Sequence, residues 1–218
     1  MAGRPPWSTR KLPVSLPLFP LTGVLLLPRG LLPLNIFEPR YLNMVDDALA
    51  GDRLIGMIQP SDPEPHGVNP PLHRIGCAGR ITSFAEDGER YLITLTGVSR
   101  FDVIEEVATT RLYRRAVPDW APYAADPAPD GTGPIDRIRL IAGLKQYFQL
   151  RSLQIDWKAL EATTDERLVT TMAMICPFGP VEKQNLLQAA DLAERARLLT
   201  GLIEMALLER PGGGSARH

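Results

Sequence analysis

A proline-rich segment between Pro118 and Pro134 constrains the fold of this 218-residue chain more than any other feature. The segment contains five prolines, two glycines and three aspartates, but no basic residue. Proline lacks the backbone donor that a helix interior or a central strand requires, so the segment can form neither. We therefore interpret residues 120–134 as a partly extended linker that separates residues 14–119 from residues 135–210.

The residues before the linker have the pattern of β-strands with one helix. Short apolar runs predict strands at 16–19, 31–37 and 53–59, and a period-two alternation predicts another at 75–83.

A hairpin is indicated further along. The Asp87-Gly88 pair favours a type I′ turn, after which a strand returns from Arg90 and bends at Gly97. The run 112–120 predicts one more strand. About six strands and one helix are the content of a small closed or half-closed barrel.

The single helix of this half follows the charged junction Glu38-Pro39-Arg40. Pro39 is tolerated at the first helical position, and Gly51 stands where a C-terminal cap is expected. Glu38 and Arg40 could form a polar clamp for a ligand. We favour the alternative, in which Glu38 caps the helix and serves its dipole while Arg40 pairs locally or with another strand.

The residues after the linker have helical patterns. Apolar residues nearly all round predict that 135–150 is a buried central helix. Later helix starts are indicated by Thr163 with its capping-box partner Glu166, by Pro180, and by Asp191 with Glu194. The fold class is therefore α+β, a barrel with one helix followed by a C-terminal bundle of four or five helices.

Composition excludes several classes of protein. A net charge of −1 argues against a general nucleic-acid or anionic-membrane binder. Prolines interrupt the apolar N-terminal run, so we expect no signal peptide, and no apolar window is long enough to span a membrane. Two cysteines far apart favour neither a disulfide framework nor a zinc site. We expect a protein of a reducing compartment, the cytoplasm.

The sequence contains no motif of a known catalytic site. His73 and Cys77 share a strand face but would lie roughly 13 Å apart, too far to act as base and nucleophile. Cys176 has the surroundings of a core residue at a helix end, and adjacent carboxylates such as Glu105-Glu106 indicate solvated surface. We therefore expect no catalytic residue, no cofactor and no metal.

Ordered motifs along most of the chain resemble the N-terminal, substrate-binding domain of Lon protease. The first half contains LPLFPL, the turn LPRG at 27–30 and PLNIFEPRY, which includes Glu38, Pro39, Arg40 and Tyr41. The family's G-x-x-R-F segment is matched at Gly97, Arg100 and Phe101, and PFGPVEKQNLL matches its helical half. The resemblance covers roughly residues 14–208.

The resemblance implies a PUA-like pseudo-barrel followed by a helical bundle. In full-length Lon this region precedes an ATPase module and a Ser-Lys peptidase domain, of which the present sequence contains neither. It is similar to a stand-alone, non-catalytic module that binds unfolded or tagged polypeptide segments, with an adaptor role beside an ATP-dependent protease. We expect a monomer or weak dimer.

Candidate binding surfaces are the loop from Ser61 to Pro71, the cleft between barrel and bundle, and the linker aromatics Trp120 and Tyr123. The alternative function is an RNA-binding PUA-like module. Residues 1–119 hold 13 basic and 13 acidic residues, and the local basic cluster is Arg111, Arg114 and Arg115. This balance disfavours RNA.

Overall fold

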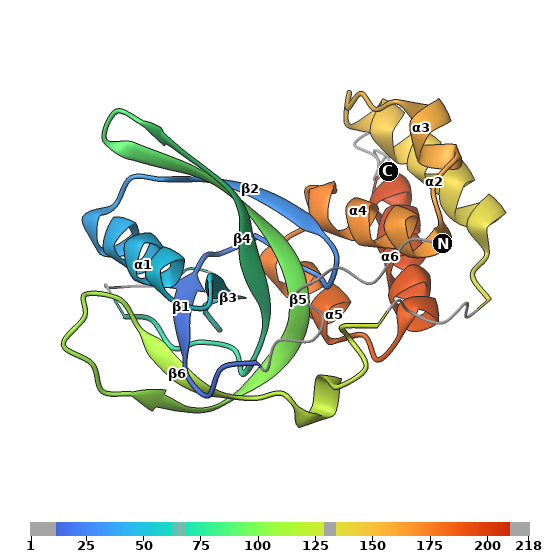
Figure 1. Cartoon of the computed structure of the whole chain (residues 1–218). Coiled ribbons are helices and arrows are strands. Elements are labelled where there is room, and N and C mark those ends of the chain that lie inside the picture. The colour runs from blue at the N-terminus through green and yellow to red at the C-terminus, as the bar shows by residue number, and fades with distance from the viewer. Residues whose placement is uncertain (1–11, 63, 65–66, 68, 129–133, 210–218) are drawn as a thin grey trace, which may run out of the picture.

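A computed structural model describes residues 12–62, 64, 67, 69–128 and 134–209 (Figure 1). Its α+β architecture agrees with the sequence prediction. The strands are β1 Leu16–Pro20, β2 Leu31–Ile36, β3 Leu54–Ile58, β4 Ile75–Asp87, β5 Arg90–Val107 and β6 Arg115–Asp119. The last strand begins at Arg115 rather than at the predicted position 112. The predictions for the N- and C-terminal segments 1–11 and 210–218 lie outside the described residues.

The sheet closes into a small barrel with one strand left outside the ring. Its order is β2-β5-β4-β3-β1-β6, and β6 also pairs with β5. Five of the described strands thus form a ring, while β2 pairs with the first part of β5 from Tyr91 to Thr96. Within the described part of the chain, the other edge of β2 is unpaired.

The bend at Gly97 allows β5 to pair with β2 over its first part and with strands of the ring. The register with β4 shifts here, because Gly79 faces Gly97 but Ala78 faces Ser99. A Cβ atom at Gly97 would lie 2.0 Å from the carbonyl oxygen of Leu27, so only glycine fits. The predicted bend is confirmed.

The predicted type I′ turn is wrong in its type. Gly88 and Glu89 connect Asp87 to its partner Arg90. In the described residues, Gly88 has a φ of 61° while Glu89 is absent from the positive-φ residues. A positive φ at the first central residue alone is the pattern of a type II′ turn.

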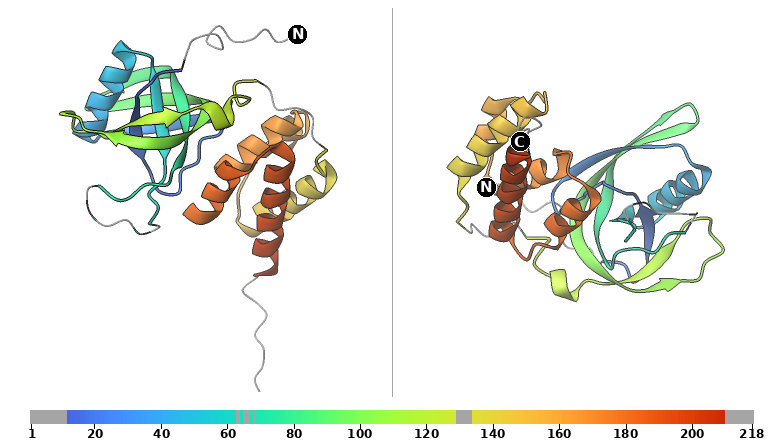
Figure 2. Two further views of the ribbon diagram at one scale, coloured as in Figure 1. Left: turned by 90° about the horizontal axis from the view of Figure 1, so that it is seen from below. Right: turned by 180° about the vertical axis from the view of Figure 1, so that it is seen from behind.

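The barrel is covered on opposite sides by α1 Pro39–Ala50 and by the helical bundle (Figure 2). Helix α1 begins at Pro39, as predicted, and buries Tyr41, Met44, Val45 and Ala48. A cluster of buried apolar side chains runs continuously from the barrel into the bundle, and a smaller cluster around Phe101 fills the rest of the barrel.

The bundle consists of α2 Arg137–Leu150, α3 Trp157–Glu161, α4 Asp165–Ile175, α5 Pro180–Gln188 and α6 Leu192–Leu208. The prediction that α2 is buried all round is wrong, because Ile138 is 85% exposed and only one face is buried. Helix α6 occupies the centre instead, since it packs against α2, α4 and α5. Apolar composition did not reveal which side of α2 meets the bundle.

Of the two side-chain N-caps predicted in the bundle, one is displaced by one residue. Thr164, not Thr163, is the N-cap of α4, and its hydroxyl accepts the N–H of Arg167. Thr163 instead donates its hydroxyl to the carbonyl of Leu160, and Glu166 pairs with Arg29. The cap of α6 is confirmed, because Asp191 accepts the N–H of Glu194.

Candidate binding surfaces

The charged junction before α1 forms a local pair. Arg40 donates to Glu38 through Nε and Nη2 at 3.0 and 2.9 Å. Glu38 occupies the N-cap position, but within the described residues its side chain makes no capping hydrogen bond, so that expectation is wrong. The Arg40 guanidinium lies 4.4 Å from the centre of the Tyr41 ring, which itself packs against Phe19 at 4.4 Å. The expectation that Arg40 pairs locally is confirmed.

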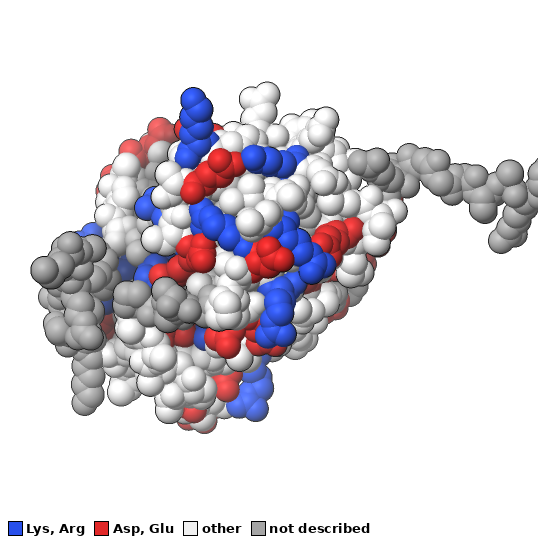
Figure 3. Space-filling view, turned by 90° about the vertical axis from the view of Figure 1, so that its right-hand side faces the viewer, with Lys and Arg blue, Asp and Glu red and all other residues white. Residues whose placement is uncertain are grey.

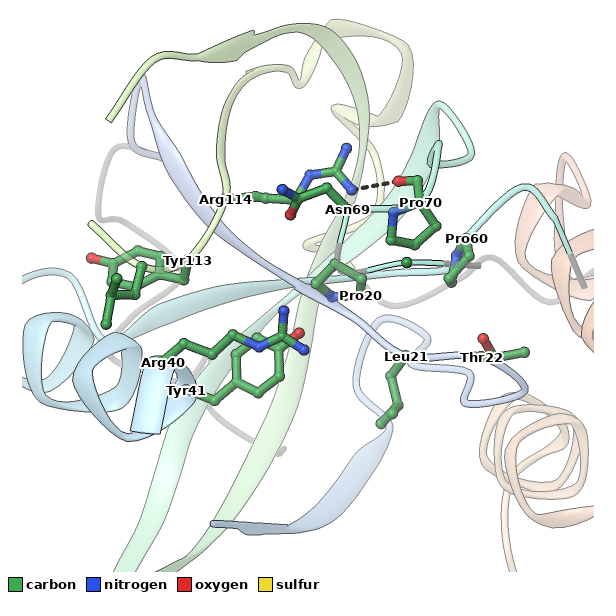
Figure 4. A pocket seen from close by; sticks show the side chains of 12 residues that line it. Pro20, Leu21, Thr22, Arg40, Tyr41, Pro60, Asn69, Pro70, Tyr113 and Arg114 are labelled. Atoms are coloured by element: carbon green, nitrogen blue, oxygen red, sulfur yellow. Dashed lines mark hydrogen bonds between the residues drawn. The ribbon is translucent and has the colours of Figure 1, made fainter. Parts of the chain in front are cut away.

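Arg40 and Tyr41 face two adjoining hollows, of about 270 and 180 Å³, which we call together the Arg40 groove. Pro20, Leu21, Arg40 and Tyr41 line both. The other lining residues are Thr22, Pro60, Gly67, Asn69, Pro70, Leu112, Tyr113 and Arg114 in the first and Phe19, Leu34, Asn35, Ile36, Phe37 and Glu38 in the second. Figure 4 shows Arg40 and Tyr41 on one side of the first hollow and Arg114 and Pro70 across from them.

Polar contacts hold the walls of this groove. Arg114 donates to Glu106 at 2.7 Å and to the carbonyl of Pro70 at 2.6 Å, which ties the loop before β4 to the barrel. Burial raises the pKa of the Tyr41 hydroxyl, while the nearby charges of Arg40 and Arg114 act to lower it. The first hollow therefore has an arginine on each of two walls, and each arginine is paired with a glutamate that does not line this hollow.

A second concave surface lies between the two halves of the chain. This barrel–bundle cleft has a volume of about 680 Å³ and is lined by Arg29, Gly30, Leu31, Thr164, Glu166, Arg167, Thr170, Thr171, Met174 and Ile175. Leu31 is 59% exposed and Ile175 is 50% exposed. The cleft thus presents large apolar side chains to solvent at the N-terminal end of β2.

The turn at residues 27–30 shapes this cleft. Arg29 has a φ of 63° and pairs with Glu166 of α4. A Cβ atom at Gly30 would lie 2.3 Å from the sulfur of Met174, so glycine lets the turn approach α4 closely. The turn that resembles the family motif therefore serves as a contact between barrel and bundle.

A buried ion pair ties the segment before α2 to the barrel, and its arginine also contacts the bundle; the sequence did not reveal it. Asp126 lies in the segment interpreted as a linker, yet it is 6% exposed and binds Arg100 through both oxygens at 2.9 Å. Arg100 also donates to the carbonyl of Leu187 in the last turn of α5 and to that of Ala189, the residue at its C-cap. We call this cluster the Arg100 latch. Composition alone could not tell a solvated aspartate from a buried one.

The polar residues of the helical motif complete the interface. Gln184 of α5 accepts from Gln59 at 3.1 Å and donates to the carbonyl of Ile75 in the barrel. Lys183 donates to the carbonyl of Met174 near the end of α4, and burial lowers its pKa. Gln184 thus fixes α5 on the barrel, while Lys183 ties α5 to α4 within the bundle.

The linker aromatics make contacts within the protein. Trp120 donates to the carbonyl of Pro13 at 3.0 Å and packs edge-on against Phe101 at 5.8 Å. Tyr123 lies under the Arg100 guanidinium at 4.7 Å. They line neither of the two surfaces above, and their binding role stays a prediction. Of the candidate loop from Ser61 to Pro71, residues 63, 65, 66 and 68 lie outside the described residues.

Both cysteines are shielded from chemistry. Burial raises the pKa of the Cys77 thiol far above its ordinary value and that of Cys176 to about 12. Such thiols stay protonated and unreactive at neutral pH. Across the described ranges, no group of three or more His, Cys, Asp or Glu side chains could hold a metal ion.

The face of the molecule seen in Figure 3, on the bundle side, mixes charges of both signs. Ion pairs such as Arg139–Glu204 and Lys145–Glu161 occur there, at 2.7 and 2.6 Å. A phosphate-binding surface would instead need basic side chains clustered without acidic neighbours. As for membranes, none of the helices described is both long enough and apolar enough to span a bilayer.

The described residues thus form a small barrel joined to a helical bundle, with concave surfaces on the barrel and between the two halves. The chain belongs to the family described as the ATP-dependent protease La (LON) substrate-binding domain, whose model matches residues 15–205. The sequence resemblance is thereby confirmed.

Individual proteins agree with this membership. Lon protease of Dictyoglomus thermophilum is 26% identical over 92% of this chain, and Lon protease of Syntrophus aciditrophicus is 33% identical over 44% of it. The matched regions are 26% and 13% of those proteins. The fold is that of the Lon N-terminal domain protein from Xanthomonas campestris, with a TM-score of 0.59, 22% identity and coverage of 90% of this chain and 99% of that one.

Proposed function

We propose that this protein is a non-catalytic module that binds apolar segments of unfolded or tagged polypeptides in the barrel–bundle cleft. As an adaptor or substrate receptor in protein quality control, it presents these segments to an ATP-dependent protease. Its two buried thiols fit a reducing compartment such as the cytoplasm.

The observation that carries this proposal is the pair of exposed apolar side chains, Leu31 and Ile175, that line one cleft from two different halves of the chain. Exposed apolar residues in a concave surface mark binding sites for apolar partners. Met174 lies beside them, and the flexible thioether of methionine adapts to many side chains. Family membership supports a polypeptide as the partner.

The test is binding of reduced, carboxymethylated α-lactalbumin, which is permanently unfolded, followed by fluorescence anisotropy. The wild-type protein should bind this chain and not native α-lactalbumin. Ile175→Ser should weaken binding about tenfold, because one large apolar contact contributes about 1–3 kcal/mol.

The matched control is Ile138→Ser, the same change at an isoleucine that is 85% exposed on α2. It should leave the affinity unchanged. The proposal would be contradicted if Ile175→Ser and Ile138→Ser lost the same amount of affinity, or if native and unfolded α-lactalbumin bound equally well. Faster degradation of the unfolded chain by an added ATP-dependent protease would support the adaptor role, and an unchanged rate would count against it.

A further inference from the structure

The Arg40 groove combines apolar and charged walls in a way that the barrel–bundle cleft does not. Arg40 lines both hollows of the groove, whereas Phe37 lines only one and Leu112 only the other. Phe37 is 63% exposed and Leu112 is 70% exposed. Each of the two hollows thus combines Arg40 with one large apolar residue that is mostly exposed.

The charge of the groove favours a negative ligand group. The Arg40 side chain is 30% exposed and that of its partner Glu38 is 44% exposed. On the opposite wall, Arg114 is 17% exposed and its partner Glu106 is 44% exposed. In both pairs the guanidinium lies deeper than the carboxylate, so solvent screens the negative member more.

The groove is also bounded by backbone that can pair with an extended chain. Residues Leu34 to Phe37 line it, and β2 has an unpaired edge within the described residues. An unpaired strand edge binds extended peptides through their main chain. Pro33 lacks an N–H group and restricts such pairing to the second half of β2.

We infer that the Arg40 groove is a second polypeptide site, which selects extended segments with an acidic residue flanked by large apolar residues. The inference rests on the proposed polypeptide binding and adds a sequence preference at a separate surface. The acidic side chain lies between Arg40 and Arg114, and the apolar side chains contact Phe37 and Leu112. Charge-assisted bonds to a guanidinium are stronger than neutral ones, so the carboxylate provides the selectivity.

The experiment uses two fluorescent synthetic ten-residue peptides, identical except for a central Asp or Asn between Phe and Leu residues. By anisotropy, the wild-type protein should bind the Asp peptide about tenfold tighter than the Asn peptide. Arg40→Gln should reduce this difference, because Arg114 remains as the one guanidinium beside the acidic side chain. Phe37→Ser and Leu112→Ser should each weaken the binding of both peptides, while the ratio of the two affinities stays the same.

Arg139→Gln is the matched control, because it removes an arginine from an exposed ion pair on α2. It should leave both affinities unchanged. The inference would be overturned by equal wild-type affinities for the two peptides, by an undiminished preference in Arg40→Gln, by an equal effect of Arg139→Gln, or by no binding of either peptide. Ile175→Ser distinguishes failure of this inference from failure of the proposed function. It should weaken the binding of unfolded α-lactalbumin to the cleft but not the binding of the Asp peptide to the groove.

Discussion

The barrel–bundle cleft and the Arg40 groove differ in what holds their walls together. The cleft is lined by residues 29–31 and by residues 164–175, so its shape depends on how the bundle sits on the barrel. The groove is lined by residues of the first half alone, from Phe19 to Arg114. The contacts between the halves, above all the Arg100 latch, should therefore control the cleft while leaving the groove intact.

The largest effect is expected from breaking the latch with Asp126→Ala. This change leaves the Arg100 side chain, 8% exposed, buried without its carboxylate. Removing one member of a buried pair lowers the free energy of unfolding by about 3–5 kcal/mol, which denaturant unfolding would measure. Below the melting temperature, binding of unfolded α-lactalbumin should fall far more than binding of the Asp peptide.

The control for the latch is Glu204→Ala, which breaks the exposed pair with Arg139. The free energy of unfolding should stay nearly unchanged, because exposed pairs contribute little. Two results would show that the latch does not distinguish the surfaces. One is a comparable loss of unfolding free energy in Asp126→Ala and Glu204→Ala; the other is an equal loss of cleft binding and groove binding in Asp126→Ala.

The next effect concerns the barrel, on which both surfaces depend. Gly97→Ala places a Cβ atom 2.0 Å from the carbonyl oxygen of Leu27, and such overpacking destabilises by about 1–3 kcal/mol or more. Gly201→Ala in α6 meets no atom within 4 Å and should stabilise by up to about 1 kcal/mol. The midpoint temperature of thermal unfolding should therefore fall in Gly97→Ala and rise in Gly201→Ala. A downward shift in both variants would refute the steric explanation.

Local patterns predicted most of the fold, because strands and helix starts depend on near neighbours. The helix after Pro39 and the bend at Gly97 follow from proline and glycine chemistry. Local chemistry could not predict whether Thr163 or Thr164 is the N-cap of α4, because both are good caps and only the packing of α4 decides between them. The exposed face of α2 was missed for a similar reason, since the apolar residues of α2 are spread around its axis.

The binding surfaces were harder to predict than the fold. The sequence indicated a cleft between barrel and bundle, yet it could not say which residues line it, since Leu31 and Ile175 are far apart in the chain. Asp126 resembled any other aspartate in a proline-rich segment. The junction at Arg40 was interpreted as a helix start, because its meeting with Pro70 and Arg114 depends on barrel closure.

A smaller effect depends on pH and concerns a buried thiol of the bundle. The folded protein keeps the Cys176 thiol, at the end of α4, protonated up to a pKa of about 12, whereas an unfolded thiol ionises near 9. The stability from this group is complete below pH 9 and declines as pH rises, by about 1.4 kcal/mol per pH unit. Cys176→Ala should flatten the fall in free energy of unfolding between pH 9 and 11. An unchanged slope would contradict the assignment.

The smallest effect tests the wall of the cleft alone. Thr164→Ala removes the cap of α4, whose hydroxyl accepts the N–H of Arg167, and should lower stability by about 1 kcal/mol. The Arg167 amide should then exchange its hydrogen several-fold faster, and cleft binding should weaken slightly while Asp-peptide binding stays constant. Asp191→Ala removes an equivalent cap from α6, yet it should leave the Arg167 amide unaffected. Equal exchange at Arg167 in both variants would mean that α4 is held by its packing on the barrel, and the cleft would then depend on the interface between the halves rather than on its own helix.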